Sequence, residues 1–278
     1  MTDHSAGNTG NTPQDGPSDR IRSDRPHSAR VWGYLLGGKE NYPADRQVGD
    51  MIQEMFPDIA LLARVQRYFL ARAVRFLAGE AGIRQFLDIG AGLPTVDNTH
   101  EVAQRVAPEC RIVYVDNDPL VLVHAQALLT STPEGACDYI DADVRDPELI
   151  LRKAAKALDF TRPIALTLLG IMGQIPDSDD PWGIVEHLLD ALPAGSYLAL
   201  SDGTNTNATL NHAIETYNAN SASSYHLRSP DQIARFFDRL EPVEPGVVPT
   251  SMWRPDLPDI GDTPANVDSM CGVGHKPA

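Results

Sequence analysis

Cysteine is scarce in this sequence of 278 residues, and the three that occur follow no paired pattern. Cys110, Cys137 and Cys271 are widely spaced, odd in number and without a CxxC pair. A disulfide framework or a zinc site needs patterned cysteines, so the sequence predicts neither, and we expect no metal. Unpaired thiols are typical of a reducing compartment, which favours the cytoplasm.

Long hydrophobic runs are also missing. The longest apolar stretch, around residues 164–172, falls far below the roughly 20 residues that a membrane helix needs. The first residues lack the apolar core of a secretory signal. Because 42% of the residues are nevertheless hydrophobic, which is ordinary for a globular chain, we expect a cytoplasmic protein with a sizeable core and no membrane partner.

Basic side chains are outnumbered. The chain has 23 Lys and Arg against 38 Asp and Glu, so its formal net charge is −15. Proteins bind nucleic acids and anionic membranes through clustered basic side chains. We therefore expect a small molecule rather than a nucleic acid as partner, and the oligomeric state stays open.

Composition divides the chain into three parts. Residues 1–26 are rich in small polar residues and nearly free of large apolar ones, which predicts a disordered tail. In residues 27–82 the apolar residues recur at three-to-four spacing, most clearly between Leu62 and Phe76, which predicts a helical lid or cap. Residues 83–278 then form the main domain.

The main domain alternates short apolar runs with helical stretches. Aspartate followed by proline marks two helix starts, Asp118 with Pro119 and Asp146 with Pro147, because a carboxylate caps the helix and proline suits its first position. Strands alternating with helices predict an α/β fold with a doubly wound, mainly parallel, Rossmann-like sheet. The five predicted strands are residues 85–89, 111–115, 138–142, 163–169 and 196–201.

The segment FLDIGAGLPT, residues 86–95, is the strongest functional signal. An apolar run ends in Asp88 and breaks into Gly90, Ala91 and Gly92, and the residues that follow can open a helix. Glycines allow positive φ and let a ligand approach the backbone. The next strand delivers Asp116 at the place where a nucleotide site needs a carboxylate for ribose hydroxyls. The two signals together predict a nucleotide-type cofactor site.

Charge indicates which nucleotide. Asp88 and Asp97 flank the glycines with no Lys or Arg between them, and Thr95 stands where the dinucleotide fingerprint has a third glycine. Such a loop repels a pyrophosphate but attracts the ammonium and sulfonium of S-adenosylmethionine. S-adenosylmethionine is therefore the predicted cofactor. A nicotinamide-dependent oxidoreductase remains an alternative, because it shares the glycine turn and the ribose carboxylate.

Four segments carry a family resemblance. Residues 28–46, 86–109, 113–129 and 236–255 resemble the actinobacterial S-adenosylmethionine-dependent methyltransferases long described only as a domain of unknown function. The resemblance covers nearly everything after residue 26. It implies a class I methyltransferase fold, an S-adenosylmethionine cofactor and methyl transfer, and it supplies no acceptor. It also implies that VEPGVV and VDSMCGV in the tail pair as an antiparallel hairpin at the sheet edge.

The resemblance also implies roles for single residues. Asp88 would lie by the methionine end of the cofactor, Asp143 would receive the adenine amino group, and Val144 would pack on the adenine ring. The loop that follows the fourth strand, with Gly170, would place its backbone against the methionyl moiety. For Asn117 a place at the adenosine rim and a role in helix capping explain the sequence equally well.

The acceptor side is less defined by the sequence. The motif LLGGKENYPADR, residues 35–46, fits either a helix end closed by two glycines or a mobile lid. Aromatic and thioether side chains that flank the predicted site are the pocket candidates. They are Trp32, Tyr34, Tyr42, Met172 and Trp182.

The catalytic residue is not identified by the sequence. Related sequences carry a histidine near Gly173, and its absence here argues against a shared histidine-based mechanism. Methyl transfer can depend on positioning alone, so oxygen, nitrogen and carbon acceptors all stay open. The leading hypothesis is a methyltransferase acting on a small molecule, and a non-catalytic S-adenosylmethionine-binding protein is the alternative.

Overall fold

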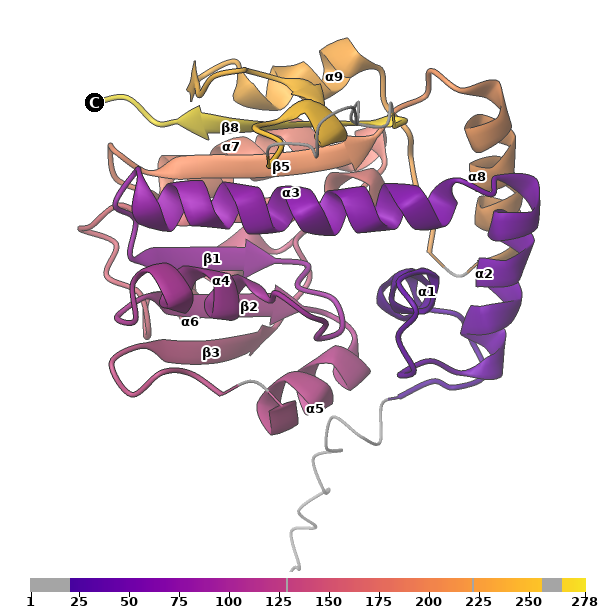
Figure 1. The fold of residues 1–278 in the computed structure, drawn as a ribbon, viewed down its shortest axis with the longest axis horizontal. Helices are drawn as coiled ribbons and strands as arrows, with labels where there is room; N and C mark the ends of the chain where they lie inside the picture. The colour runs from indigo at the N-terminus through magenta and orange to yellow at the C-terminus, as the bar shows by residue number, and fades with distance from the viewer. Residues whose placement is uncertain (1–20, 129, 222, 257–266) are drawn as a thin grey trace, which may run out of the picture.

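A single eight-stranded sheet organises the part of the chain that the computed structural model describes, residues 21–128, 130–221, 223–256 and 267–278 (Figure 1). Its order is β3-β2-β1-β4-β5-β8-β6, and β7 pairs with β8. The first five strands are parallel and β8 is antiparallel to β5. These five are β1 (Gln85–Ile89), β2 (Arg111–Asp116), β3 (Ala136–Asp141), β4 (Ala165–Leu169) and β5 (Tyr197–Gly203). The predicted doubly wound sheet is thus confirmed.

Helices cover both faces of this sheet (Figure 1). On one face α3 (Ile59–Gly79) and α4 (Thr99–Val106) share a buried cluster with Phe86 of β1. On the other face α6 (Pro147–Ala154) and α7 (Pro181–Asp190) pack against the strand side chains that point to that face. Among the described residues, none of the helices combines the length and apolar character that a bilayer crossing requires.

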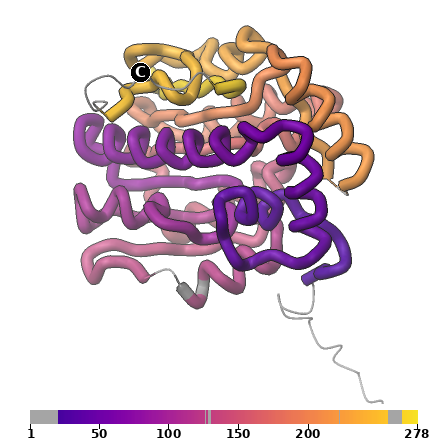
Figure 2. Tube along the Cα trace, turned by 45° about the vertical axis from the view of Figure 1, so that its right-hand side comes forward, coloured from indigo at the N-terminus to yellow at the C-terminus, as the bar shows by residue number. Residues whose placement is uncertain are grey.

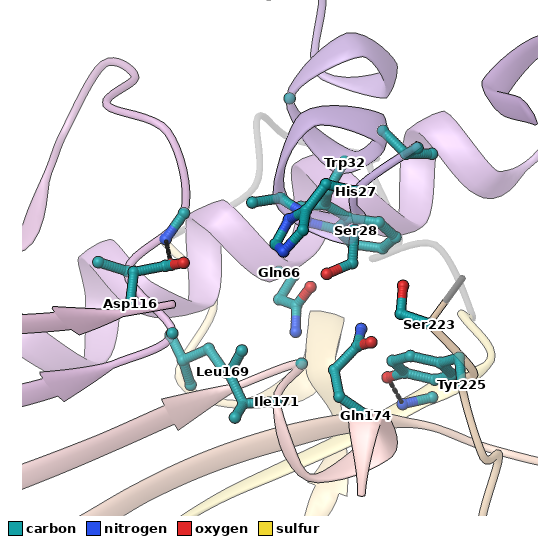
Figure 3. Close-up of a pocket in the computed structure, with 18 of the residues that line it drawn as sticks. His27, Ser28, Trp32, Gln66, Asp116, Leu169, Ile171, Gln174, Ser223 and Tyr225 are labelled. Carbon is teal, nitrogen blue, oxygen red and sulfur yellow. Dashed lines mark hydrogen bonds between the residues drawn. The ribbon is translucent and has the colours of Figure 1, made fainter. Parts of the chain in front are cut away.

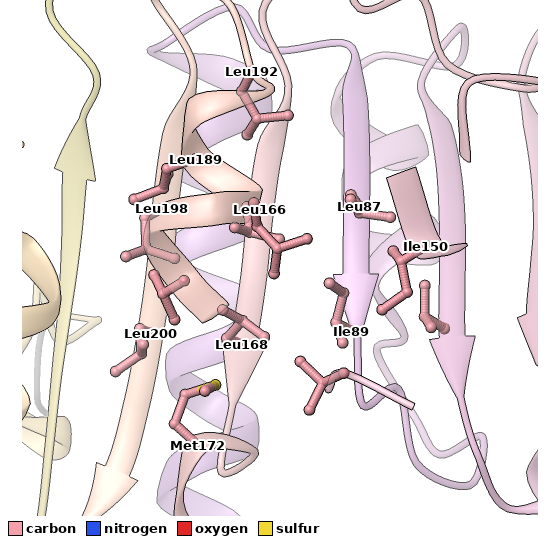
Figure 4. Close-up of a cluster of buried hydrophobic side chains, with 14 of the residues drawn as sticks. Leu87, Ile89, Ile150, Leu166, Leu168, Met172, Leu189, Leu192, Leu198 and Leu200 are labelled. Atoms are coloured by element: carbon pink, nitrogen blue, oxygen red, sulfur yellow. The ribbon is translucent and has the colours of Figure 1, made fainter. Parts of the chain in front are cut away.

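Alternation along each central strand divides the core between the two faces. Successive strand side chains point to opposite sides, so Leu87 and Ile89 lie in one cluster while Phe86 lies in the other. Figure 4 shows the first cluster, in which leucines of β1, β4 and β5 meet Ile150 of α6 and Leu189 of α7. Burial on both faces rigidly fixes the carboxyl ends of the strands, where the sequence places the site.

Three helices gather at these carboxyl ends. They are α1 (Ser28–Leu35), α2 (Pro43–Met55) and α8 (Ala208–Asn220), and Figures 1 and 2 show them on the same side of the molecule. Their apolar sides form a separate buried cluster that includes Val31, Ile52 and Leu210. The helical character predicted for residues 27–82 is confirmed. Of the predicted tail, residues 1–20 lie outside the described residues.

The remaining elements connect or extend this framework. The helix α5 (Pro119–Leu128) follows β2, and the short helix α9 (Pro230–Ala234) precedes the tail. The single-turn 3-10 helices are η2 (Met172–Gln174), η3 (Asp177–Asp179), η4 (Arg235–Phe237) and η5 (Thr250–Met252).

The tail pairs antiparallel as predicted, but in two short steps. β6 (Glu241–Pro242) and β7 (Val248–Pro249) each pair with β8 (Ser269–His275), and Gly246 turns between them with φ 88°. Proline has no N–H to donate, so this arm cannot form a continuous ladder. Consequently β8 lies between β5 and β6 and is not itself the edge of the sheet.

Candidate cofactor and acceptor site

A cavity of about 430 Å³ lies at the carboxyl ends of the central strands, beneath α1 (Figure 3). Its volume is in the range of small-molecule sites, roughly 300 to 1,000 Å³. Every residue that the sequence predicts for cofactor binding lines it. These are Asp88, Gly90, Ala91, Gly92, Asp116, Asn117, Asp143, Val144 and Gly170.

The turn after β1 needs its glycines. Gly90 has φ 76° and Gly92 has φ 65°, a region that side-chain-bearing residues rarely adopt. A Cβ on Gly90 would lie only 2.0 Å from Cδ1 of Ile171. The Gly90 N–H also donates to the carbonyl of Val115 on β2 over 2.7 Å. The first glycine therefore brings the loops after β1 and β4 into contact.

Asp116 ends β2 and faces the cavity from a buried position. Its Oδ2 accepts from the N–H of Gly92 and its Oδ1 accepts from the N–H of Asp118, each over 2.9 Å. Burial raises the pKa of Asp116, and the two amides and His27 oppose that rise. Asp118 caps α5 through the N–H of Leu120, as predicted, so the cap leaves Asp116 to the cavity.

The charges around the glycine turn differ from those that the sequence indicates. Asp88 lines the cavity, but its oxygens accept from the hydroxyls of Thr99 and Thr167, each over 2.6 Å. Burial raises the pKa of Asp88, and these hydroxyls oppose it. Asp97 forms an ion pair with Arg105. The charge of Asp97 is therefore balanced by Arg105. The turn is less negative than the positions of Asp88 and Asp97 in the sequence indicate.

Arg67 is a cavity residue that the sequence analysis missed. It extends from α3, lines the cavity, and donates through Nη2 to the carbonyls of Val96 and Asp97 over 3.2 and 3.0 Å. Burial lowers its pKa, while the carboxylate of Asp88 opposes that change. A guanidinium beside the glycine turn is a natural partner for a ligand carboxylate. No motif marks Arg67, because it lies in a helix whose apolar spacing predicts only packing.

The loops after β2 and β3 meet at the far end of the cavity. Nδ2 of Asn117 donates to Oδ2 of Asp143 over 3.2 Å, and Arg145 donates to the same carboxylate over 2.9 Å. Val144 is buried beside them and lines the cavity. This end combines an apolar wall with polar groups on one edge, which is what a purine ring requires.

Buried charges hold α1 over the cavity. Arg30 is 3% exposed and its guanidinium lies 3.1 Å from Asp118 and 3.6 Å from Asp45. It also donates to the carbonyls of Arg22 and Arg25. Since Asp118 caps α5 next to the cavity, this cluster joins the N-terminal segment to the loop after β2.

The opposite end of the cavity is mainly apolar. Trp32, the one predicted pocket residue that lines it, faces inward from α1, and Gln66, Gln174 and Ser223 add neutral polar groups (Figure 3). Asp116 lies across the cavity from Ser223 in this view. The apolar lining comes from α1, α2, α3, α8 and the segment after α8. It includes Leu36, Ile52, Ile59, Leu62, Leu210, Ile214, Tyr217 and Leu227.

The other four predicted pocket residues do not line the cavity. The hydroxyl of Tyr34 donates to Asp50 on α2, and Tyr42 packs with Leu93 and Leu120. Met172 is fully buried in the core beneath β4. Trp182 stacks on Phe236 and donates its indole N–H to the carbonyl of Gln232. Sequence spacing did not show in which direction each of these side chains points.

Tyr225 explains why position 173 is glycine. A Cβ on Gly173 would lie 2.3 Å from Cζ of Tyr225, so the tyrosine ring occupies the space that a larger residue would need. Tyr225 lines the cavity and its hydroxyl donates to Oδ1 of Asp202 over 2.5 Å. The N–H of Gly203, at the end of β5, donates to the same hydroxyl over 3.3 Å. A tyrosine thus takes the place that the resemblance led us to associate with histidine.

Comparison with known proteins gives a family match and two close structural relatives. Residues 14–277 match the S-adenosyl methyltransferase family. A DUF574 family protein from Streptomyces avermitilis is 46% identical, with a TM-score of 0.88 over 93% of this chain and all of that one. A candidate methyltransferase from Thermobifida fusca is 44% identical, with a TM-score of 0.84 over 91% of this chain and 96% of that one.

More distant structures share the fold alone. An O-methyltransferase family protein from Burkholderia thailandensis is 11% identical, with a TM-score of 0.52 over 88% of this chain and 64% of that one. No curated protein matches the sequence.

Proposed function

The chain belongs to the S-adenosyl methyltransferase family, and on that premise we propose how its cavity divides between cofactor and acceptor. It is an S-adenosylmethionine-dependent methyltransferase, which confirms the leading hypothesis from the sequence. The alternative of a nicotinamide-dependent oxidoreductase is not supported. The observation that carries the proposed division is that all nine predicted cofactor residues line one cavity whose other end is mainly apolar.

The cofactor half extends from the turn after β1 to the loop after β3. Asp116 accepts hydrogen bonds from the ribose hydroxyls, while Asp143 and Val144 hold the adenine. Gly90 and Gly170 both line the cavity with positive φ, so their backbone faces the methionyl chain. Arg67 pairs with the methionyl carboxylate, and buried Asp88 stabilises the ammonium. The cavity thus offers an oppositely charged side chain to the carboxylate and to the ammonium of the methionyl part.

The acceptor half is the apolar end below α1, α2 and α8. Its side chains exclude water and its few polar groups are neutral, so it selects a small, mainly apolar molecule. The cavity of about 430 Å³ must hold both reactants, which leaves room for a small acceptor only.

The chain's contribution to methyl transfer is mainly positional. Bound S-adenosylmethionine supplies a methyl group on a positively charged sulfur. Gly90 and Gly170 fix the sulfonium end at the carboxyl ends of β1 and β4, and Trp32 and Gln174 confine the acceptor on the far side. Aligning two reactants in this way removes much of the entropic barrier to a displacement reaction.

The assignment of Arg67 offers a direct test. Arg67→Met should weaken S-adenosylhomocysteine roughly 10- to 150-fold, the loss of about 1.5 to 3 kcal/mol from a charge-assisted hydrogen bond. Binding of 5′-methylthioadenosine, which lacks the carboxylate, should not change. Arg64→Met is the matched control, because Arg64 is exposed one turn away on α3. Calorimetric titration that shows equal losses for both ligands would reject the carboxylate contact.

We place the reaction in the cytoplasm and the protein in an actinobacterium. All three cysteines, Cys110, Cys137 and Cys271, are free thiols, which agrees with a reducing compartment. The two close structural relatives come from Streptomyces and Thermobifida.

A further inference from the structure

Tyr225 and Asp202 form a buried hydrogen-bonded pair in the wall of the acceptor half. The ring of Tyr225 lies against Gly173 and Gly203, which follow β4 and end β5, so two positions without side chains make room for it. Its hydroxyl donates to Asp202, which is 1% exposed and lies behind the tyrosine as seen from the cavity lining. Figure 3 shows Tyr225 next to Ser223 and Gln174, across the cavity from Asp116.

We propose that Tyr225 and Asp202 are the proton-accepting pair of this methyltransferase, and that its acceptor is an uncharged phenol. This inference rests on the proposed function, because it uses the acceptor half of the same cavity. Tyr225 would contact the acceptor and is the catalytic residue, while Asp202 acts through it and is a positioning residue.

Charge excludes an amine as the preferred acceptor. An aliphatic amine is protonated near pH 7, and its burial is costly without a carboxylate partner. Among the described residues that line the cavity, the carboxylates are Asp88, Asp116 and Asp143, and all three lie at the cofactor half. The lining of the acceptor half offers hydroxyls and amides, and the carboxylate of Asp202 lies behind Tyr225 rather than in the lining itself. It therefore fits a neutral group that donates one proton.

The proton route follows from the hydrogen bonds. As the acceptor oxygen forms its bond to the methyl carbon, the carbon–sulfur bond breaks and its electron pair stays on sulfur. The phenol proton passes to Oη of Tyr225, and the Tyr225 proton passes to Oδ1 of Asp202. The products are a methyl ether, neutral S-adenosylhomocysteine and a protonated carboxyl, which releases its proton to water afterwards. A phenol has a pKa near 10 and loses its proton far more readily than an aliphatic alcohol.

The surroundings of Asp202 support a carboxylate that can take up this proton. Burial raises its pKa to about 6, and the Tyr225 hydrogen bond and the charge of Arg228 oppose the rise. Arg228 is itself paired with Asp177 over 2.9 Å, so its charge is shared. Burial and the neighbouring Asp202 raise the pKa of Tyr225, so the tyrosine hydroxyl keeps its own proton until the acceptor reacts.

The test compares phenols with amines of matched size. 2-Naphthol and 4-methylphenol are the phenols, and 2-naphthylmethylamine and 4-methylbenzylamine are the amines of matched size. Each is incubated with the full-length protein and S-adenosylmethionine, and release of S-adenosylhomocysteine is measured. We expect turnover with the phenols and none with the amines. Tyr225→Phe keeps the ring and should lower kcat about 100-fold, within the usual range for general-base catalysis, without changing the KM for S-adenosylmethionine. Tyr139→Phe is the control, because Tyr139 lies outside this cavity.

The outcomes separate this inference from the proposed function. If S-adenosylhomocysteine fails to bind, the cofactor assignment is wrong. If it binds and amines react, or neither phenol does, the acceptor class is rejected. A loss of activity in Ser224→Ala but not in Tyr225→Phe would also overturn the assignment, because Ser224 contacts His226 over 2.9 Å and lines the same cavity. Asp202→Asn should remove the rise of kcat with pH near 6, whereas a purely structural role would leave that pH profile unchanged.

Discussion

Gly92 and Asp116 are 24 residues apart in sequence and are joined by a hydrogen bond of 2.9 Å from the backbone N–H to Oδ2. The bond links the turn after β1 to the end of β2. It fixes the carboxylate at the cavity wall, and a second bond from the N–H of Asp118 holds the other oxygen. Such pre-organisation reduces the entropy that ligand binding must remove. The two strongest sequence signals therefore describe one assembled unit.

The first prediction concerns the glycine turn. Gly90→Ala should destabilise the protein by two effects, the left-handed backbone at about 1–2 kcal/mol and overlap with Ile171 at roughly 1–3 kcal/mol. Gly82→Ala is the matched control, since Gly82 also has positive φ but no atom within 4 Å of the added Cβ. Denaturant unfolding without ligand measures both variants. Equal losses would show that Ile171 exerts no constraint on Gly90.

The second prediction concerns the buried guanidinium that holds α1. Arg30→Met should lower the free energy of unfolding by about 3–5 kcal/mol, because Asp45 and Asp118 both lose the buried guanidinium that pairs with them. It should also weaken S-adenosylhomocysteine, since α1 covers the cavity. Arg46→Met, at an exposed position on α2, is the control. Thermal unfolding that drops equally in both variants would contradict this account of the cluster.

The third prediction concerns pH. The pKa of Asp202 is raised to about 6 by burial, above the value of about 3.9 for an unfolded aspartate. Between about pH 4 and 6 the folded state therefore holds a proton that the unfolded state has lost. The free energy of unfolding falls as pH rises through this window. Asp202→Asn should gain roughly 3 kcal/mol over the wild type across that window. A difference in unfolding free energy that is independent of pH would show that the folded pKa is not raised.

Local patterns were sufficient to predict the framework. The strand β1 has the predicted bounds, because an apolar run followed by glycines is a signal contained within ten residues. The helix caps Asp118 and Asp146 were equally recognisable, since an aspartate before proline defines a helix start locally. The same locality explains why the residues predicted at the strand ends meet in one cavity.

Long-range contacts were beyond sequence patterns. Tyr225 enters the cavity from a polar segment after α8, and nothing near it indicates that Gly173 leaves space for its ring. Arg67 lies in an amphipathic helix whose spacing predicts packing alone. Tyr34 and Trp182 do not line the cavity for a related reason, because nearness of an element to the site does not fix the direction of a side chain.

The central claim is that Asp116 binds the ribose of S-adenosylmethionine, and calorimetric titration with S-adenosylhomocysteine tests it most directly. Asp116→Ala should weaken binding by about 1 to 3 kcal/mol through loss of charge-assisted hydrogen bonds. Asp138→Asn, at an exposed position on the neighbouring strand β3, should bind as the wild type does. An affinity unchanged in Asp116→Ala, in protein that unfolds at the wild-type temperature, would contradict the assignment.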